Sequence, residues 1–356
     1  MAGAGEAAAA AALPFLVHDV AGEYSIASGQ LANTTMELLV DHRCLETPQG
    51  WVLALHRASR RTFLWRPQDG HRIALPPMAT GLPRKCKCLL THKLSDKPSA
   101  ADACFVVVFD LASPHYWFCH VRGHPWFAKW KHSRYTLPRL NSEGRPLVQD
   151  LGIAAVGGKI YQQLSRHELG VLEFDPVHTE PTLTRIEVDA VRVPRGSLVS
   201  TSYLVESCDE LFLVVVYFRV DTLQEIARVA LYKMDFSTPA WRKADRIGDR
   251  VFLLGGVRGG FSNFGASCPA SKHGLAAGCI YFFNHIFFQE NKIHVFNVTS
   301  GTEEVRCIFQ EFNNAFRSPF WILPTEDPYT IGLLGLAKWF FTSGQRLLSS
   351  YTDFLK

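Results

Sequence analysis

The sequence predicts an all-β fold: a single β-propeller of about six blades, with seven as the alternative, followed by a C-terminal amphipathic helix. Three observations predict this fold. A module of short strand-like segments recurs, some of these segments are apolar on both faces, and both ends of the folded region carry strand-like segments that could share one blade. The expected division is a disordered alanine-rich leader over residues 1–12, the propeller over 13–328 and the helix over 329–356.

The recurring module consists of an apolar run, a turn, a second strand that ends in a large apolar residue, and a third strand. A kelch-type blade repeats after about 50 residues. The large residues that mark successive copies are about 50 to 60 positions apart, and they are Trp65, Phe118, Phe174, Met234 and Phe296.

Residues 106–109 and 211–218 are apolar at every position, which is typical of a strand covered on both faces by neighbouring blades. Segments 13–17 and 24–26 near the N-terminus and 320–324 near the C-terminus are expected to complete one blade, because a closed ring leaves no exposed edge. A short helix is expected within residues 35–46. An irregular pair of β-sandwiches remains the alternative fold.

The segment after Pro328 changes to a helical pattern, with apolar residues spaced by three or four positions or by multiples of these. We expect an amphipathic helix that docks on the propeller, with a partner-binding or membrane-surface helix as the alternative. The apolar positions are Leu333, Ala337, Phe340, Leu347, Tyr351 and Phe354.

Composition favours an intracellular globular protein. Hydrophobic residues make up 47% of the 356 residues, and the net charge is only +4. The nine cysteines form no C-x-x-C pair, and the alanine-rich N-terminus lacks the basic region of a secretory signal. No apolar run is long enough to span a bilayer. We therefore expect reduced thiols and a cytoplasmic or nuclear location.

Candidate sites for phosphate binding and covalent catalysis are incomplete. The glycine-rich segment 255–260 follows a strand but lacks the Lys-Ser/Thr of a P-loop. Cys268 and His273 could form a nucleophile–base pair only if they met in space. The sequence thus predicts neither a cofactor nor an enzymatic role.

Histidines and aromatic residues gather between positions 115 and 135. The four histidines, with no acidic residue between the first and the last, resemble amphipathic strands more than a metal site. Basic residues interleaved with tryptophans over 122–134 could stack bases, but no concentrated basic stripe supports nucleic-acid binding. We expect neither a metal nor a nucleic acid. The histidines are His115, His120, His124 and His132.

Several motifs resemble the plant KIB-type β-propeller family, whose members are often described as F-box or kelch-like proteins. The most specific motif is Gly-Cys-Ile-Tyr-Phe-Phe-Asn at 278–284, and Gly-Trp-Val at 50–52 and Pro-Phe-Trp-Ile-Leu-Pro at 319–324 support it. The resemblance implies a propeller that binds a target protein. Many members carry an F-box that docks on a Skp1-type adaptor of a ubiquitin ligase, but the residues before Leu13 do not provide the helical segment this requires. The resemblance therefore leaves adaptor binding open.

The longest predicted loop between strands runs from Gly255 to Gly278, and loops around a propeller mouth commonly bind partners. Arginine and aromatic residues are enriched at interface hot spots. The alternative is that Phe261 and Phe264 pin the loop to the blade. The candidate partner-binding residues are Arg258, Phe261, Asn263, Phe264 and Lys272.

The sequence therefore favours a protein-binding propeller, with a link to ubiquitin-ligase function as a target-recognition subunit. One alternative is a decoy or structural protein without an F-box, and another is an enzyme with its active site at the propeller mouth. The partner is another protein whose identity the sequence does not reveal.

Overall fold

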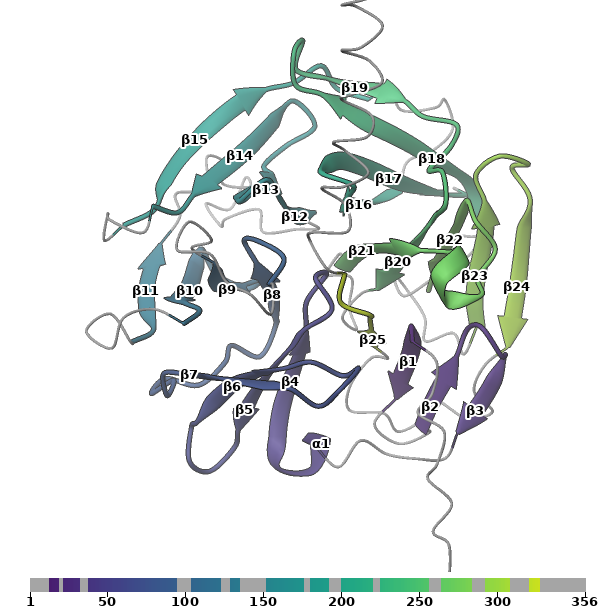
Figure 1. Ribbon diagram of the computed structural model, residues 1–356. Coiled ribbons are helices and arrows are strands. Elements are labelled where there is room, and N and C mark those ends of the chain that lie inside the picture. The colour runs from purple at the N-terminus through teal and green to yellow at the C-terminus, as the bar shows by residue number, and fades with distance from the viewer. Residues whose placement is uncertain are drawn as a thin grey trace, which may run out of the picture.

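Six β-sheets surround a central axis in the computed structural model of the chain (Figure 1). The structure describes residues 13–18, 22–32, 38–94, 104–122, 129–134, 152–175, 180–191, 200–219, 225–255, 264–283, 292–307 and 320–326. Within these ranges the predicted all-β propeller is confirmed, and it has six blades rather than seven. The expected leader (1–12) and C-terminal helix (329–356) lie outside the described residues.

The first three blades are four-stranded and antiparallel, and in each the first strand lies nearest the axis. Blade 1 contains β4 (His42–Glu46), β5 (Val52–His56), β6 (Thr62–Trp65) and β7 (Arg72–Leu75). Blade 2 contains β8 (Cys86–Leu90), β9 (Phe105–Asp110), β10 (His115–His120) and β11 (Lys131–Arg134). Blade 3 contains β12 (Ile153–Val156), β13 (Lys159–Gln163), β14 (Glu168–Glu173) and β15 (Thr182–Glu187).

Blades 4 to 6 complete the ring. Blade 4 contains β16 (Ser200–Ser207), β17 (Glu210–Phe218), β18 (Ile226–Asp235) and β19 (Ala240–Lys243). Blade 5 contains β21 (Phe264–Pro269), β20 (Arg250–Gly255), β22 (Cys279–Phe282), β23 (Lys292–Asn297) and β24 (Glu303–Cys307), with β20 parallel to β22. Blade 6 contains β25 (Phe320–Ile322), β1 (Phe15–His18), β2 (Gly22–Ser25) and β3 (Gln30–Ala32).

Blade 6 joins the two ends of the described chain, as the sequence predicted. β25 pairs antiparallel with β1, and Leu16 lies opposite Trp321 in this register. The Trp321 indole nitrogen also donates a hydrogen bond to the Leu254 carbonyl of blade 5 at 3.0 Å. This pairing gives the inner strand of the last blade a partner, so the sixth blade is completed by both ends of the described chain and the ring closes.

Each seam between blades is filled by its own hydrophobic cluster. Along β17, the residues at odd positions pack against blade 3 and those at even positions pack against blade 5. The side chains of β9 divide in the same way between blades 1 and 3. Because successive strand side chains point to opposite faces, a strand between two blades needs apolar residues at every position, as the sequence indicated.

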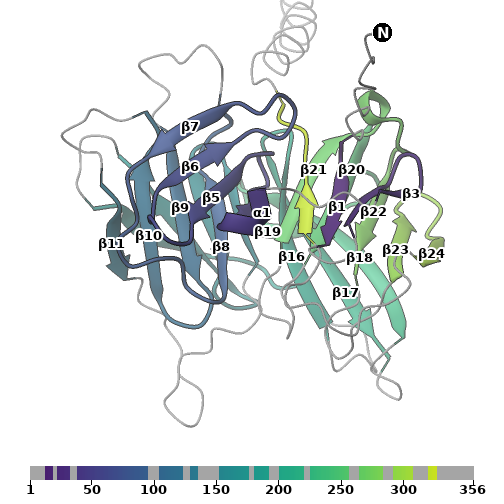
Figure 2. The ribbon, with the colours of Figure 1, turned by 90° about the horizontal axis from the view of Figure 1, so that it is seen from below.

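Two helical segments are short. The region expected to be helical contains the four-residue helix α1 (Leu38–Asp41), after which the chain enters β4 and pairs with β5. A 3-10 turn, η2 (Ser271–His273), follows β21. Among the described residues, no helix is long and apolar enough to cross a membrane. The view in Figure 2, turned by 90° from Figure 1, shows the ring from a second direction.

Candidate functional site

A network of charged side chains lies at one mouth of the central channel, where the inner strands end. Lys93 follows β8 of blade 2, Glu206 is the penultimate residue of β16 in blade 4, and Glu326 follows β25 of blade 6. Arg250 opens β20 of blade 5 and lies opposite Pro269, the last residue of β21. Blades 2 and 5 face each other in a ring of six, so the network crosses the channel.

The distances in this network are those of ion pairs. The ammonium nitrogen of Lys93 lies 3.1 Å from a Glu326 oxygen and 3.8 Å from a Glu206 oxygen. A guanidinium nitrogen of Arg250 lies 2.7 Å from the other Glu326 oxygen. Arg250 Nε also donates to the Ser267 hydroxyl at 2.8 Å. Glu326 therefore joins two cations that come from different blades.

Burial and charge act in opposite directions on these groups. Burial raises the pKa of Glu206 above its usual value, although the nearby Lys93 opposes this rise. Burial alone would lower the pKa of Lys93, but Glu206 and Glu326 outweigh it and hold that pKa above its usual value. The positive charge of Lys93 and the negative charges of the glutamates therefore stabilise one another, as expected for ions that are largely removed from water.

The inner strands of blades 4 and 5 approach closely beside this network. A Cβ atom on Gly265 would lie 2.6 Å from the Leu204 carbonyl oxygen, so only glycine fits there without a shift of the backbone. The Ser207 and Ser267 hydroxyls lie 2.9 Å apart across the same seam. Glycine at 265 thus allows β16 and β21 to position the groups of the channel mouth.

A cavity of about 370 Å³ lies between blades 4 and 5 next to the mouth. Arg250 belongs to both the network and the cavity wall, and Cys208 brings an exposed thiol to the rim. The lining mixes cationic and anionic groups, so it does not select one charge. Its residues are Ser207, Cys208, Glu210, Phe212, Lys233, Ala244, Asp245, Arg246, Ile247, Gly248 and Arg250.

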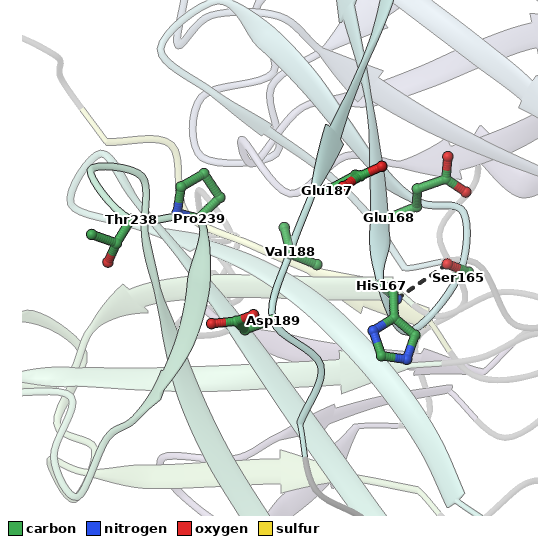
Figure 3. Close-up of a pocket in the computed structure, with 8 residues that line it drawn as sticks. All are labelled: Ser165, His167, Glu168, Glu187, Val188, Asp189, Thr238 and Pro239. Carbon is green, nitrogen blue, oxygen red and sulfur yellow. Dashed lines mark hydrogen bonds between the residues drawn. The ribbon is translucent and has the colours of Figure 1, made fainter.

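A larger groove of about 730 Å³ lies between blades 3 and 4, close to their outermost strands β15 and β19 (Figure 3). In Figure 3, Glu187, Val188 and Asp189 lie between Thr238 and Pro239 on one side and His167 and Glu168 on the other. A main-chain hydrogen bond of 3.0 Å from the Asp189 amide to the Pro239 carbonyl joins the two blades within the lining of the groove. The lining residues are Ser165, His167, Glu168, Glu187, Val188, Asp189, Thr238 and Pro239.

An exposed aromatic residue lies in the same turn as two of the residues that line this groove. Phe236 lies in the turn that also supplies Thr238 and Pro239, and it is 42% exposed. Its ring centroid lies 5.2 Å from that of Tyr161 in blade 3. We refer to Phe236 together with the lining residues as the blade 3–4 groove. It offers carboxylates, neutral polar groups, a histidine and the apolar side chains of Phe236, Val188 and Pro239.

The structure separates the partner-binding residues predicted from the sequence. The predicted loop from Gly255 to Gly278 is wrong as a single loop, because β21 forms the inner strand of blade 5 within it. Phe264 begins this strand and is buried, whereas Lys272 is exposed on η2 beyond its other end. Arg258, Phe261 and Asn263 lie outside the described residues.

Cys268 and His273 do not have the properties of a nucleophile and its base. Cys268 is buried in β21, and burial raises the pKa of its thiol to about 12. Burial lowers the pKa of His273 below its usual value. The thiolate is the reactive form of cysteine, and the Cys268 thiol stays protonated at neutral pH. Cys268 therefore serves as a core residue.

Comparison with known proteins identifies the family. The KIB1-4 beta-propeller family matches residues 23–297, which is more than half of the chain. The chain belongs to the KIB1-4 beta-propeller family. The match runs from β2 in blade 6 to the end of β23 in blade 5, so the KIB1-4 homology covers strands of all six blades. No curated protein matches the chain.

Several solved structures resemble this KIB1-4 propeller at low identity. A Bacteroides caccae protein of unknown function is 10% identical with a TM-score of 0.29, and the match covers 81% of this chain and 83% of that one. The Cps50 (Swd1) β-propeller domain from Myceliophthora thermophila is 9% identical with a TM-score of 0.30, and the match covers 84% and 96%. The dihydro-heme d1 dehydrogenase NirN is 10% identical with a TM-score of 0.30, over 85% and 74%.

Proposed function

We propose that this KIB1-4 propeller is a protein-binding module and that the blade 3–4 groove is its binding surface. The observation that carries the proposal is the exposed Phe236 ring, in a turn that also lines a groove of about 730 Å³. Aromatic side chains are common anchors at protein interfaces, and polar groups around them set orientation. The groove joins two rigid blades, which hold both sides of the surface in place.

The ion-paired channel mouth supports a binding role over a catalytic one. Lys93, Arg250, Glu206 and Glu326 pair with one another, so their charges are compensated within the network. A catalytic acid or base needs access to its substrate. We therefore assign the network to the architecture of the propeller and place recognition on its outer surface.

The sequence-predicted residues are further candidate contacts within the same proposal, on the two sides of β21 in the sequence. Lys272 is exposed on η2, after β21. Arg258, Phe261 and Asn263, proposed as a second surface, precede Phe264, which begins β21 and is buried in the core. In this proposal Phe264 acts by positioning, and Lys272 contacts the partner separately from the three residues of the second surface.

The family resemblance further leads us to propose that the bound protein is a target of ubiquitin-dependent turnover, in a cytoplasmic or nuclear setting. The alternative is a decoy that binds the same targets without delivering them. Co-purification with a Skp1-type adaptor separates the two. An adaptor recovered with the propeller supports target delivery, and partners recovered without an adaptor support the decoy.

The groove is tested by comparing partners recovered with matched variants from the native tissue. Phe236→Ser combined with Glu187→Lys changes the groove, while Val305→Ser combined with Glu304→Lys places the same new side chains at two exposed positions of β24. We expect the groove variant to lose proteins that the wild type and the control retain, at unchanged melting temperature. Equal recovery with both variants would rule out the groove. Arg258→Ala with Phe261→Ala tests the second surface in the same way.

A further inference from the structure

Strands β10 and β11 bring two of the four clustered histidines together on the outer part of blade 2. His115 pairs in register with Arg134, and Trp117 pairs with His132. The two histidines are therefore diagonal neighbours on one face of an antiparallel ladder. His120 lies at the other end of β10 against Phe105, and His124 lies outside the described residues.

The two imidazole rings meet edge to edge. Nε2 of His132 lies 2.9 Å from Nδ1 of His115, and the ring centroids are 4.9 Å apart with planes inclined by 18°. These values place the two nitrogens between the rings, facing each other. His132 is exposed and His115 is half-buried, so the pair is open to solvent on rigid neighbouring strands.

This spacing matches the separation of two nitrogen ligands on one metal ion. Metal–imidazole bonds measure about 2.0–2.1 Å, so two nitrogens at a right angle around one ion lie about 2.9 Å apart. A tetrahedral angle would require about 3.3 Å between them. Right angles between ligands are typical of the tetragonal geometry of Cu²⁺ and Ni²⁺. The side chains need only rotate enough for both lone pairs to converge on the ion.

We propose that His115 and His132 bind a divalent transition-metal ion of the tetragonal class, Cu²⁺ or Ni²⁺, through Nδ1 and Nε2 respectively. Within the described part of the chain, no group of three or more His, Cys, Asp or Glu side chains could hold a metal. In this proposal the two imidazoles are the protein ligands, and water occupies the remaining positions. The proton between the two facing nitrogens moves to the other nitrogen of the ring that carries it, Nδ1 of His132 or Nε2 of His115, so that both facing nitrogens offer a lone pair to the ion.

Trp117 supplies a built-in reporter for this site. Its ring centroid lies 4.9 Å from that of His132. A paramagnetic Cu²⁺ ion held by His132 should therefore quench the fluorescence of this tryptophan. The effect is separable from that on other tryptophans, because Trp117→Phe removes the reporter and leaves both ligands in place.

The test is a titration of the whole chain with CuCl₂ alone, followed by fluorescence and by electron paramagnetic resonance. We expect one equivalent of Cu²⁺ with an axial signal from two imidazole nitrogens. His115→Ala or His132→Ala should weaken binding by about tenfold or more. The control His71→Ala removes an exposed histidine in blade 1 and should bind as the wild type does. Trp117→Phe should keep the resonance signal and lose much of the quenching.

Unchanged affinity and signal in the His115→Ala, His132→Ala double variant would overturn the proposal, as would loss of the signal in His71→Ala. Both ligand positions are on surface strands, and a melting curve for each variant checks that the blade remains folded. NiCl₂ in place of CuCl₂ should show the same dependence on the two histidines, and an absence of that dependence for both ions contradicts the site.

Discussion

Arg250 contacts Glu326 at 2.7 Å and thereby connects blade 5 to the segment that follows the last strand of blade 6. The same carboxylate forms an ion pair with Lys93 of blade 2. One carboxylate therefore holds three parts of the ring together at the channel mouth. Because all three side chains are largely buried, removal of one leaves the others without charge compensation.

Glu326→Gln should destabilise the propeller by about 3 kcal/mol, since it leaves Lys93 and Arg250 facing each other with less negative charge. The measurement is the free energy of unfolding by denaturant. The control Glu173→Gln removes the exposed partner of Lys159 and should change this free energy by less than about 1 kcal/mol. Equal effects of the two variants would show that the network does not stabilise the ring.

Gly265→Ala should destabilise the protein by about 1–3 kcal/mol, because the new methyl group would collide with the Leu204 carbonyl across the blade 4–5 seam. Gly255→Ala is the matched control on the paired strand β20. Its Cβ would make ordinary contacts of 3.4 Å or more with Trp321 and Phe264. Thermal unfolding of both variants checks this prediction, and a control as unstable as Gly265→Ala contradicts the steric explanation.

Lys87 on β8 should make stability depend on pH above neutrality. Its ammonium group donates to the Ile153 carbonyl at 2.8 Å, and burial lowers its pKa to about 7, despite the nearby Glu46. The unfolded lysine keeps its proton up to about pH 10.4. Between these pH values the unfolded state binds more protons than the folded state. The contribution of Lys87 to the free energy of unfolding should therefore rise as the pH rises from about 7 to 10.

The difference in unfolding free energy between the wild type and Lys87→Met isolates this contribution from the other groups that titrate in the same range. We expect the wild type to gain stability relative to Lys87→Met as pH rises from 7 to 10. The variant should be the more stable protein near pH 7 if the cost of burying the charge exceeds the hydrogen bond. A difference that does not change with pH would mean that Lys87 keeps its proton when folded.

The cysteines should fall into two classes of reactivity. Cys208 and Cys307 are exposed, whereas the other seven are buried. Burial raises the thiol pKa of Cys104 to about 11, so its thiolate is scarce at neutral pH. A thiol reagent at pH 8 should label two cysteines in the native protein and nine after unfolding. Cys208→Ser with Cys307→Ser should abolish the native reaction, and residual labelling would indicate that a seam between blades opens.

Much of the fold could be predicted because its strongest signals are local. The apolar residues of β9 and β17 occupy every position since each strand contacts two blades, and this pattern is visible in one segment of sequence. The inner strands were harder to recognise. β4 lies in a segment expected to be helical, and β21 lies within a predicted loop. Both strands contain polar or small residues. Their packing and hydrogen-bonding partners lie on other strands, so the segment alone does not show a strand.

The candidate sites show the same limit. The sequence drew attention to His115 and His132, but only the register of β10 and β11 brings their nitrogens together. Nothing near Phe236 in the sequence indicates a groove, because the opposite side comes from blade 3, some 70 residues earlier. The ion pairs of Glu326 likewise join residues far apart in the chain.

The sequence by itself determined that this protein is an all-β propeller of this family, closed by strands from both ends of its folded region. The tertiary structure decided that there are six blades, which strands line the axis, and which charged groups meet across it. The physical reason is that burial on both faces leaves its pattern within a single strand. Contacts between blades depend on twist, register and close approaches such as that of Gly265 to Leu204, and these exist only once the ring has formed.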